Sequence, residues 1–465
     1  MRSSGAPISH RSQPPAVGAA REFRFPTFAR HRLGNGLQVI LSSYPRGPLV
    51  HQLLVLPGGG QQIPSSLAGL ATLTAALMDE GTDRRSALEI AHQVESLGGY
   101  LSSQADWDAL SAFLGVLAVH QHQGLELLAE IASQASFPAA ELERLRSQQL
   151  AELQRRQAQP STLASDGLAR LLYETTIYGT PILGTPDTVR SIDRQQVLET
   201  ARRQITPDGA ALVLVGDLEP EPVLELVETI FHGWQGEPRL EPVPLEPPPL
   251  DEVRISLIDR PQAPQTELWL GHVGVPRPHP DRAGLLVLNS LLGGKFTSRI
   301  NLNLRERLGI TYGASSSFAR RRGPGPFVVA ASIDTVAVGT AIEEILSEIR
   351  RLQGEQVTQD ELADTKSYLL GVFPYTLQRI EGLAACLADL AVYDLSDSYF
   401  TDFYDEVAAV TRDDLQRLAT KHLRPEQIGV VAVGPRSEIE DQLIAFGRPQ
   451  IQPATEALSD TETGQ

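Results

Sequence analysis

Histidines and neighbouring carboxylates are the residues of this sequence that could carry metal chemistry, and their spacing argues against it. The chain has ten histidines. His120 and His122 are two positions apart, which suits a pair of metal ligands on a strand, but no carboxylate at the spacing of a known motif accompanies them. His51, His272 and His279 are isolated in the sequence. Exposed or hydrogen-bonded histidines are therefore the better interpretation for all five.

A phosphate-binding loop is the second chemistry to consider, because the chain contains Gly293-Gly294-Lys295. Such a loop needs an earlier glycine and a Ser or Thr directly after the lysine. Asn289 and Phe296 stand at those two positions, so we reject a phosphate loop here. Pro57-Gly58-Gly59-Gly60 lacks a following lysine and is interpreted as a turn between a strand and a helix.

Composition and charge exclude several classes of protein. The 465 residues are enough for about two to four units at roughly 150 residues per domain. A net charge of −17 and a pI near 5.1 argue against a nucleic-acid partner, which needs a basic face. No apolar run of about 18 residues is present, so no membrane span is expected. Cys386 is the single cysteine, which excludes an intramolecular disulfide framework.

Both ends of the chain have the composition of disordered segments. Residues 1–21 contain three arginines and no acid, and the leader segment 1–23 lacks the apolar core of a secretory signal. We interpret them as a disordered leader, with a transit-type sequence as the alternative, and we favour the cytoplasm for a soluble chain. The polar residues 449–465 are interpreted as a disordered tail.

A proline-rich stretch divides the chain into two segments of similar size. Residues 236–252 hold six prolines and five carboxylates. This composition favours an extended, semi-rigid linker over a helix. We therefore predict an N-terminal domain at 24–235 and a C-terminal domain at 253–448.

The two segments resemble each other. Residues 189–216 match residues 407–434 at an offset of 218. The run from Phe137 to Leu142 matches the run from Val357 to Leu362 at an offset of 220. Two matches at nearly one offset indicate a tandem duplication.

Inside each half, short runs of branched aliphatic residues alternate with stretches of helical periodicity. Ser86 and Glu89 form a capping-box signature at the start of a helix. The predicted strands are residues 37–41, 50–56 and 109–117 in the first half and 267–273, 310–318 and 327–332 in the second. We predict an α+β fold in which each of two similar domains packs a mixed, mostly antiparallel sheet against helices.

Residues 69–82, GLATLTAALMDEGT, form the frame of a third motif. Its Gly-Leu-Ala start and Gly-Thr end resemble the zinc-binding helix of the pitrilysin-type metallopeptidases, the inverzincins, in which His-x-x-Glu-His follows directly. Thr72 stands at the first His position, Ala75 at the Glu position and Ala76 at the second His position. The frame is therefore present, and its metal ligands are absent.

Zinc hydrolysis needs imidazole and carboxylate ligands together with a base that activates the bound water. Thr72 and Ala76 share a helix face, but neither side chain can replace an imidazole. In active relatives a Glu on a later helix completes the site, and the resemblance assigns that position to Glu152. Asp79 and Glu80 at the helix end offer carboxylates without histidines. We predict no metal site in this chain, with small packing residues at the motif positions and Glu152 solvated or ion-paired.

The second half contains the stronger positive signal. Residues 291–299, LLGGKFTSR, and 304–313, LRERLGITYG, resemble the signature of the C-terminal domain of the same family. The resemblance implies that Arg305 holds a substrate carbonyl or carboxylate, and that the Tyr312 hydroxyl donates to the oxyanion formed in peptide hydrolysis. Gly309 is placed to end the helix of Arg305, so Tyr312 is predicted on the following strand. The alternative is a surface arginine and a tyrosine ring packed in the core.

Across residues 24–445 the chain resembles the short, two-domain members of that family related to mitochondrial processing peptidase. In their heterodimers one subunit carries the zinc motif and the other carries the Arg and Tyr. The resemblance implies a non-catalytic subunit without a cofactor of its own, a His-x-x-Glu-His partner that binds zinc, and a peptide substrate. The long glycine-rich loop of the non-catalytic mitochondrial subunit is missing, since only Gly293-Gly294 precedes Lys295.

Two other interpretations stay open. The chain could be a purely structural or assembly subunit that keeps the peptidase fold without a role in proteolysis, as in respiratory complexes. It could also be an independent enzyme with a divergent metal site. Peptide cleavage that depends on Arg305 and Tyr312 would separate the heterodimeric peptidase from the structural subunit. Metal analysis of the chain alone tests whether it is an independent enzyme.

Overall fold

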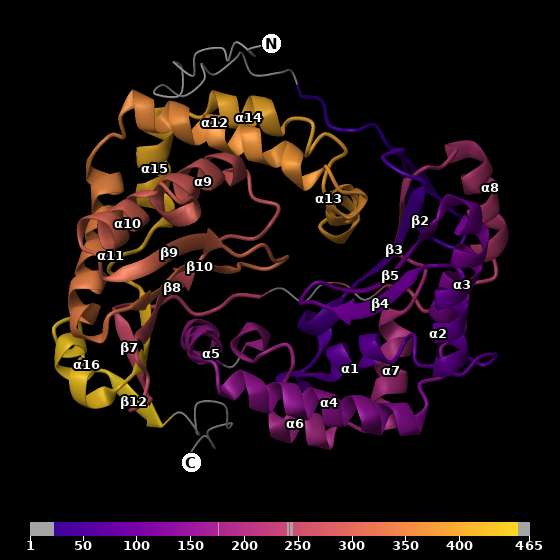
Figure 1. Ribbon diagram of the computed structural model, residues 1–465, viewed down its shortest axis with the longest axis horizontal. Helices are drawn as coiled ribbons and strands as arrows, with labels where there is room; N and C mark the ends of the chain where they lie inside the picture. Colours follow the sequence, from indigo (N-terminus) through magenta and orange to yellow (C-terminus); the bar gives the residue numbers. More distant parts are fainter. Residues whose placement is uncertain (1–22, 175, 240, 242–244, 454–465) are drawn as a thin grey trace, which may run out of the picture.

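The computed structural model describes residues 23–174, 176–239, 241 and 245–453. Figure 1 shows two similar halves that face each other, the first coloured indigo to magenta and the second red through orange to yellow. Each half holds a six-stranded sheet with helices packed on it. The duplicated α+β fold predicted from the sequence is confirmed.

The two sheets have the same plan. The first has the strand order β1-β2-β6-β3-β5-β4 and the second β12-β7-β11-β8-β10-β9. The strands of the first sheet are β1 (Ala29–Arg32), β2 (Gln38–Ser43), β3 (Leu49–Pro57), β4 (Tyr100–Ala105), β5 (Ala109–Leu117) and β6 (Ala211–Gly216). Those of the second are β7 (Arg254–Asp259), β8 (Thr266–Val273), β9 (Thr311–Phe318), β10 (Pro326–Ile333), β11 (Gly429–Gly434) and β12 (Gln450–Pro453).

The pairing of the strands also repeats. In each sheet one inner pair is parallel, β2 with β6 and β7 with β11, and the strands from there to the far edge pair antiparallel. The sheets differ at the near edge, where β1 runs antiparallel to β2 and β12 runs parallel to β7. A shared strand order with a shared parallel pair is what duplication of one folding unit produces.

The helices correspond in the same way. The first half contains α1 (Leu70–Ala76), α2 (Ala87–Ser96), α3 (Gln121–Gln134), α4 (Ala139–Gln157), α5 (Pro160–Tyr173), α6 (Pro186–Ser191), α7 (Arg194–Gln204) and α8 (Pro220–Phe231). The second contains α9 (Arg282–Asn289), α10 (Arg299–Asn301), α11 (Val338–Gly354), α12 (Gln359–Thr376), α13 (Ile380–Val392), α14 (Phe403–Ala409), α15 (Arg412–His422) and α16 (Arg436–Ile444). Asp193 and Thr411, which occupy matching positions, both accept a hydrogen bond from the third residue of the helix they precede.

Shorter helical turns join these elements. Two π-helical turns flank α10, η5 (Ser290–Gly294) and η6 (Leu302–Arg307). The 3₁₀ turns are η1 (Gly59–Gln62), η2 (Ser65–Leu67), η3 (Ala118–His120), η4 (Ile177–Gly179) and η7 (Thr335–Ala337). The turn η3 leads directly into α3, so His120 and His122 lie on helical backbone and not on a strand.

Each sheet is covered on one face by a helix that the other half supplies (Figure 1). Helix α13 of the second half packs on the first sheet, where Leu387 and Leu390 are fully buried in a cluster with Val213 and Val215. Helix α5 of the first half packs on the second sheet, with Leu163 in a cluster with Val431. The two halves therefore share apolar cores, and each sheet relies on the other half to cover apolar residues on one of its faces.

Polar contacts add to this interface through the hairpin between β9 and β10. The backbone N–H of Arg322 and the hydroxyl of Tyr393 both donate to Asp108 Oδ2, each over 3.0 Å. The Arg321 guanidinium lies over the rings of Trp107 and Tyr178, at 5.0 and 4.5 Å from their centres. Burial is the main cause that raises the pKa of Asp108 to about 6.

The ends of the chain differ in detail from the prediction. The leader was expected to include residue 23, but Phe23 stacks on Tyr404 with ring centres 5.0 Å apart. The tail was expected to begin at residue 449, but β12 pairs with β7 over Gln450–Pro453. Backbone hydrogen bonds to a neighbouring strand, which composition does not reveal, order this segment. The rest of both predicted segments, 1–22 and 454–465, lies outside the described residues.

The proline-rich stretch 236–252 forms neither helix nor strand in its described residues. Leu250 within it is buried in the cluster that α5 forms with the second sheet, which anchors the stretch to the core shared by the two halves. In the described part of the chain, no helix combines the length and apolar character needed to cross a bilayer.

Candidate functional site

Helix α1, at the frame of the zinc motif, is shorter than predicted. It was expected to extend through the frame 69–82, but it ends at Ala76. Leu77 and Met78 are fully buried beyond its end, and Thr82 pairs with Ala135, so the chain turns away from the helix axis. The carboxylates Asp79 and Glu80 accordingly lie in this turn and not on the helix.

Gly69 explains why the start of the frame is retained. It precedes α1 with a φ of 97°, a conformation that glycine adopts readily. A Cβ atom at this position would lie 2.8 Å from the carbonyl oxygen of Leu183. Gln149 of α4 donates to the same carbonyl over 2.8 Å. Backbone conformation and packing thus require a glycine at position 69, whichever residues occupy the ligand positions of the motif.

The former ligand positions of α1 are used for packing. The Thr72 hydroxyl donates to the backbone carbonyl of Ile182 over 3.0 Å. Ala75 is fully buried and Ala76 is half-buried. Glu152 on α4 is partly exposed and forms an ion pair with Arg155. Thr72, Ala75, Ala76 and Glu152 therefore do not fit a zinc ion, because no imidazole is present and the one carboxylate is already paired.

Asp79 is the titratable group nearest in sequence to these positions. Burial is the main cause that raises its pKa to about 6. Within the described residues, the group of three ligand-type side chains close enough to share a metal lies elsewhere, at His279, Asp281 and His422. Asp79 is therefore a half-buried carboxyl that lies outside that group.

Tyr312 is presented to solvent. It lies on β9, the edge strand of the second sheet, and 89% of its surface is exposed. The interpretation in which its ring packs in the core is therefore excluded. Gly309 before it adopts a φ of 67°, the left-handed conformation in which glycine ends a helical turn.

Arg305 lies on η6, which contacts β9. Its guanidinium lies over the Phe296 ring, 4.4 Å from the ring centre, and its Nε is 3.6 Å from a Glu306 carboxylate oxygen. About a third of the side chain, 36%, is exposed. Phe296 is itself 64% exposed, so the pair forms a surface feature and not part of a core.

Three other histidines considered in the sequence analysis are either buried among core residues or exposed beside a carboxylate. His51 is buried and stacks on Phe113 at 4.2 Å, and burial lowers its pKa to about 4. Burial lowers the pKa of His272 to about 4 as well. His122 is exposed and lies 3.6 Å from Glu126.

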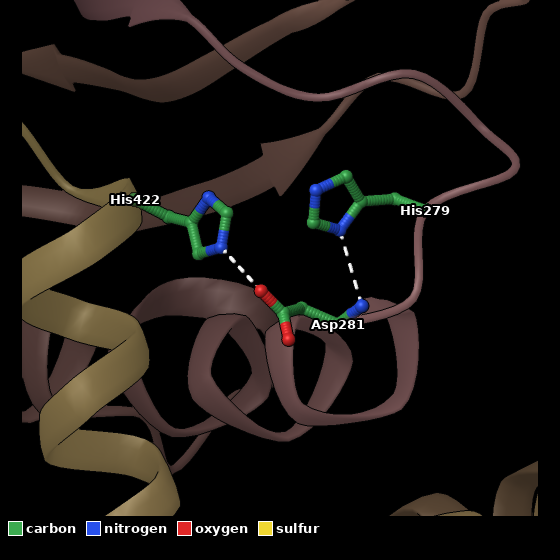
Figure 2. A group of neighbouring side chains, drawn as sticks. All are labelled: His279, Asp281 and His422. Atoms are coloured by element: carbon green, nitrogen blue, oxygen red, sulfur yellow. Dashed lines mark hydrogen bonds and ion pairs between the residues drawn. The ribbon is translucent and has the colours of Figure 1, made fainter.

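His279 is different, because the fold brings it to Asp281 and His422 (Figure 2). Asp281 is buried enough that its pKa should rise, but hydrogen bonds from Lys421 and His422 outweigh burial and hold it at about 2. Spacing could not reveal this cluster, because Asp281 and His422 are 141 positions apart.

Comparison with known proteins decides the family. The sequence profile described as "Insulinase (Peptidase family M16)" matches residues 38–186, and that described as "Peptidase M16 inactive domain" matches residues 191–369. The chain belongs to peptidase family M16. The first match lies within the first half, and the second begins in the first half before α7 and runs across the proline-rich stretch into α12 of the second half.

Relatives of this M16 chain include peptidases of bacteria and of mitochondria. It is 23% identical over 349 residues to "Uncharacterized zinc protease YmxG" of Bacillus subtilis, covering 75% of this chain and 84% of that protein. It is 22% identical over 425 residues to "Probable mitochondrial-processing peptidase subunit beta" of Arabidopsis thaliana, covering 88% of this chain and 78% of that protein.

Solved structures share the whole fold of the M16 chain. A "peptidase M16 inactive domain" from Pseudomonas fluorescens has a TM-score of 0.82 and 26% identity, covering 88% of this chain and 98% of that one. "A protease from Helicobacter pylori" has a TM-score of 0.82 and 20% identity, covering 88% of this chain and 100% of that one. Both solved structures therefore share the fold of this chain over most of its length.

Proposed function

We propose that this M16 chain is the non-catalytic subunit of a heterodimeric zinc peptidase and supplies Arg305 and Tyr312 to the site of its partner. The observation that carries the proposal is a contrast between the two halves. The first half has no imidazole at the former ligand positions Thr72 and Ala76. The second half presents an exposed tyrosine and a partly exposed arginine on neighbouring elements.

The exposure of Tyr312 supports a role outside the chain's own core. A tyrosine ring that is 89% exposed contributes little apolar burial to folding. Its hydroxyl is a donor that can reach an oxygen on another molecule. In peptide hydrolysis, such a donor stabilises the oxyanion of the tetrahedral intermediate.

The position of Tyr312 on an edge strand favours a peptide substrate. Strand β9 ends the second sheet, and part of its outer edge is already bound, because the Ala314 N–H donates to Asn301 and Asn289 donates to the Ser316 carbonyl. An extended peptide could therefore pair at the start of β9, beside Tyr312, where it would hold its carbonyls in a fixed register. Tyr312 at the start of β9 would then act on a carbonyl close to the point where that pairing begins.

Arg305 is preorganised for an anionic or carbonyl oxygen. Its guanidinium rests on the Phe296 ring, a contact that contributes about 0.5–1 kcal/mol at an exposed site. The face of the guanidinium is thus held in place while its N–H donors at the edge stay available. Arg305 would bind a carbonyl or carboxylate of the peptide beside the oxygen on which Tyr312 acts.

Zinc and the attacking water would come from the partner, an M16 subunit with an intact His-x-x-Glu-His helix. This division follows from the chemistry of the side chains, because threonine and alanine cannot replace imidazoles as zinc ligands. The mitochondrial-processing peptidase relative from Arabidopsis is named as a beta subunit, which fits a multi-subunit arrangement.

Co-expression with a zinc-motif M16 homologue from the same genome tests the proposal. We expect a stable complex that cleaves peptides, while each chain alone is inactive. Arg305→Ala should lower cleavage by the complex without weakening its assembly. Arg379→Ala is the matched control, since Arg379 is 80% exposed and pairs with Glu381 on the surface of the second half.

A structural subunit is the second candidate, and a solved neighbour favours it. The chain matches a subunit in "Complex III2 from Candida albicans" with a TM-score of 0.75 and 15% identity, which shows a shared fold. A complex that assembles and cleaves peptides equally well with Arg305→Ala and with wild-type chain would support this candidate over the first.

A further inference from the structure

Three side chains from two separate parts of the second half converge near the ends of two helices. His279 lies in the loop between β8 and α9, Asp281 directly precedes α9, and His422 is the last residue of α15. One nitrogen or oxygen atom of each lies within 4.8 Å of the others. Figure 2 shows the carboxylate of Asp281 between the two imidazoles.

The geometry of the two rings is close to that of histidines on one metal ion. Their centres are 5.2 Å apart and their planes are almost perpendicular, at 88°. Two imidazoles bound tetrahedrally to one zinc ion at about 2.0–2.1 Å hold their ring centres about 5 Å apart. Little rearrangement of the backbone is therefore needed to bring both rings to a common ion.

Hydrogen bonds now hold the cluster together. His422 Nε2 lies 2.8 Å from Asp281 Oδ2, and the Asp281 backbone N–H donates to His279 Nδ1 over 3.1 Å. The side chains of His422 and Asp281 are only 8% and 16% exposed. A metal ion would exchange these hydrogen bonds for coordinate bonds, in a site that is already largely withdrawn from water.

Two neighbouring cations compete for the carboxylate. Lys421 Nζ lies 2.7 Å from Asp281 Oδ2, and an Arg417 nitrogen lies 3.9 Å from Oδ1. Both cationic side chains are 54% exposed, so each can turn into solvent when an ion takes its place beside the carboxylate. A divalent ion brings two positive charges to Asp281 where Lys421 brings one. The carboxyl end of α15, where His422 and Lys421 lie, also favours positive charge.

We propose that His279, Asp281 and His422 form a binding site for a divalent transition-metal ion such as Zn²⁺. Two imidazoles and one carboxylate are a ligand set that suits zinc, with one position left for water or for a group from another molecule. The ion would connect the start of α9 to the end of α15. This site is independent of the helix at residues 70–76 and of the proposed role of Arg305 and Tyr312.

The proposal changes how zinc in this protein should be interpreted. Stoichiometric zinc in the purified chain would not by itself indicate a peptidase centre at α1. Zinc that depends on His279 and His422 belongs to the new site, while zinc that is independent of both lies elsewhere.

Metal titration of the full-length chain tests the site. After treatment with a chelator, the protein is titrated with Zn²⁺ by calorimetry and with Co²⁺ by visible absorption. We expect one equivalent to bind, and we expect His279→Ala and His422→Gln each to weaken binding at least about tenfold. His122→Ala is the matched control, because His122 is exposed beside a carboxylate on α3, and it should bind as wild type does.

Lys421→Met sharpens the test, since it removes the competing ammonium while leaving all three ligands, and should leave binding unchanged or stronger. Circular dichroism of each variant shows whether it is folded. His279 lies on a loop, so its variant decides the matter if the one at His422 fails to fold. Absence of stoichiometric binding by the wild-type chain, or equal binding by His279→Ala, would overturn the proposal.

Discussion

Replacing Leu387 with alanine tests whether the two halves share one core. Leu387 belongs to α13 of the second half but is fully buried in a cluster with residues of the first sheet. A buried Leu→Ala change costs about 2–5 kcal/mol, from lost transfer free energy and the cavity that remains. Leucine and alanine have similar helix propensities, so the loss reflects packing. Both halves should therefore lose stability together.

Urea unfolding followed by tryptophan fluorescence can separate the two halves. Trp234 is buried in the first half and Trp269 lies on β8 in the second. In backgrounds that keep only one of the three tryptophans, either Trp234 or Trp269, Leu387→Ala should lower the free energy of unfolding equally at both probes. Leu88→Ala is the control, because Leu88 is 66% exposed, and should change stability by less than about 0.5 kcal/mol. A shift at Trp269 with none at Trp234 would refute the shared core.

Two further substitutions test individual contacts. Asp108 is 2% exposed and its pKa is raised from 3.8 to about 6. Between these two pH values the folded state therefore holds a proton that the unfolded state has released. The free energy of unfolding consequently falls as the pH rises from about 4 to 6. Asp108→Asn should remove that dependence of stability on pH. The variant should be more stable than wild type above pH 6, by up to roughly 3 kcal/mol, and equal to it below pH 4, as measured by urea unfolding across pH. Lower stability of the variant than of wild type at pH 7 would contradict this. Gly69→Ala should lower the free energy of unfolding by about 1–3 kcal/mol, because φ is 97° and the added Cβ would meet the Leu183 carbonyl; an unchanged thermal unfolding midpoint would contradict it.

The sequence contained enough information to predict the repeated fold. The capping residues Asp193 and Thr411 and the strands β6 and β11 recur at one offset, and each is a local feature with its own signal. Local signals also predicted that Tyr312 follows Arg305 on a strand. These are cases in which backbone preference and hydrophobic pattern agree.

Long-range contacts could not be predicted in this way. The periodicity of α5 and α13 shows that each helix has an apolar face, but not that this face packs on the sheet of the other half. The meeting of Asp281 with His422 depends on the same kind of packing, between α9 and α15. The early end of α1 was missed because the buried residues Leu77 and Met78 continue a helical pattern while the chain turns.

Peptide cleavage by the reconstituted complex with Tyr312→Phe tests the central claim most directly. The variant removes only the hydroxyl of a side chain that is 89% exposed, so folding and assembly should be unchanged. Loss of one oxyanion donor lowers kcat by about 10²–10³, and we expect a decrease of that size with little change in KM. Tyr375→Phe, at a tyrosine 68% exposed on α12, should behave as wild type. Equal kcat for Tyr312→Phe and wild-type complexes would contradict the claim that this chain acts in the site of its partner.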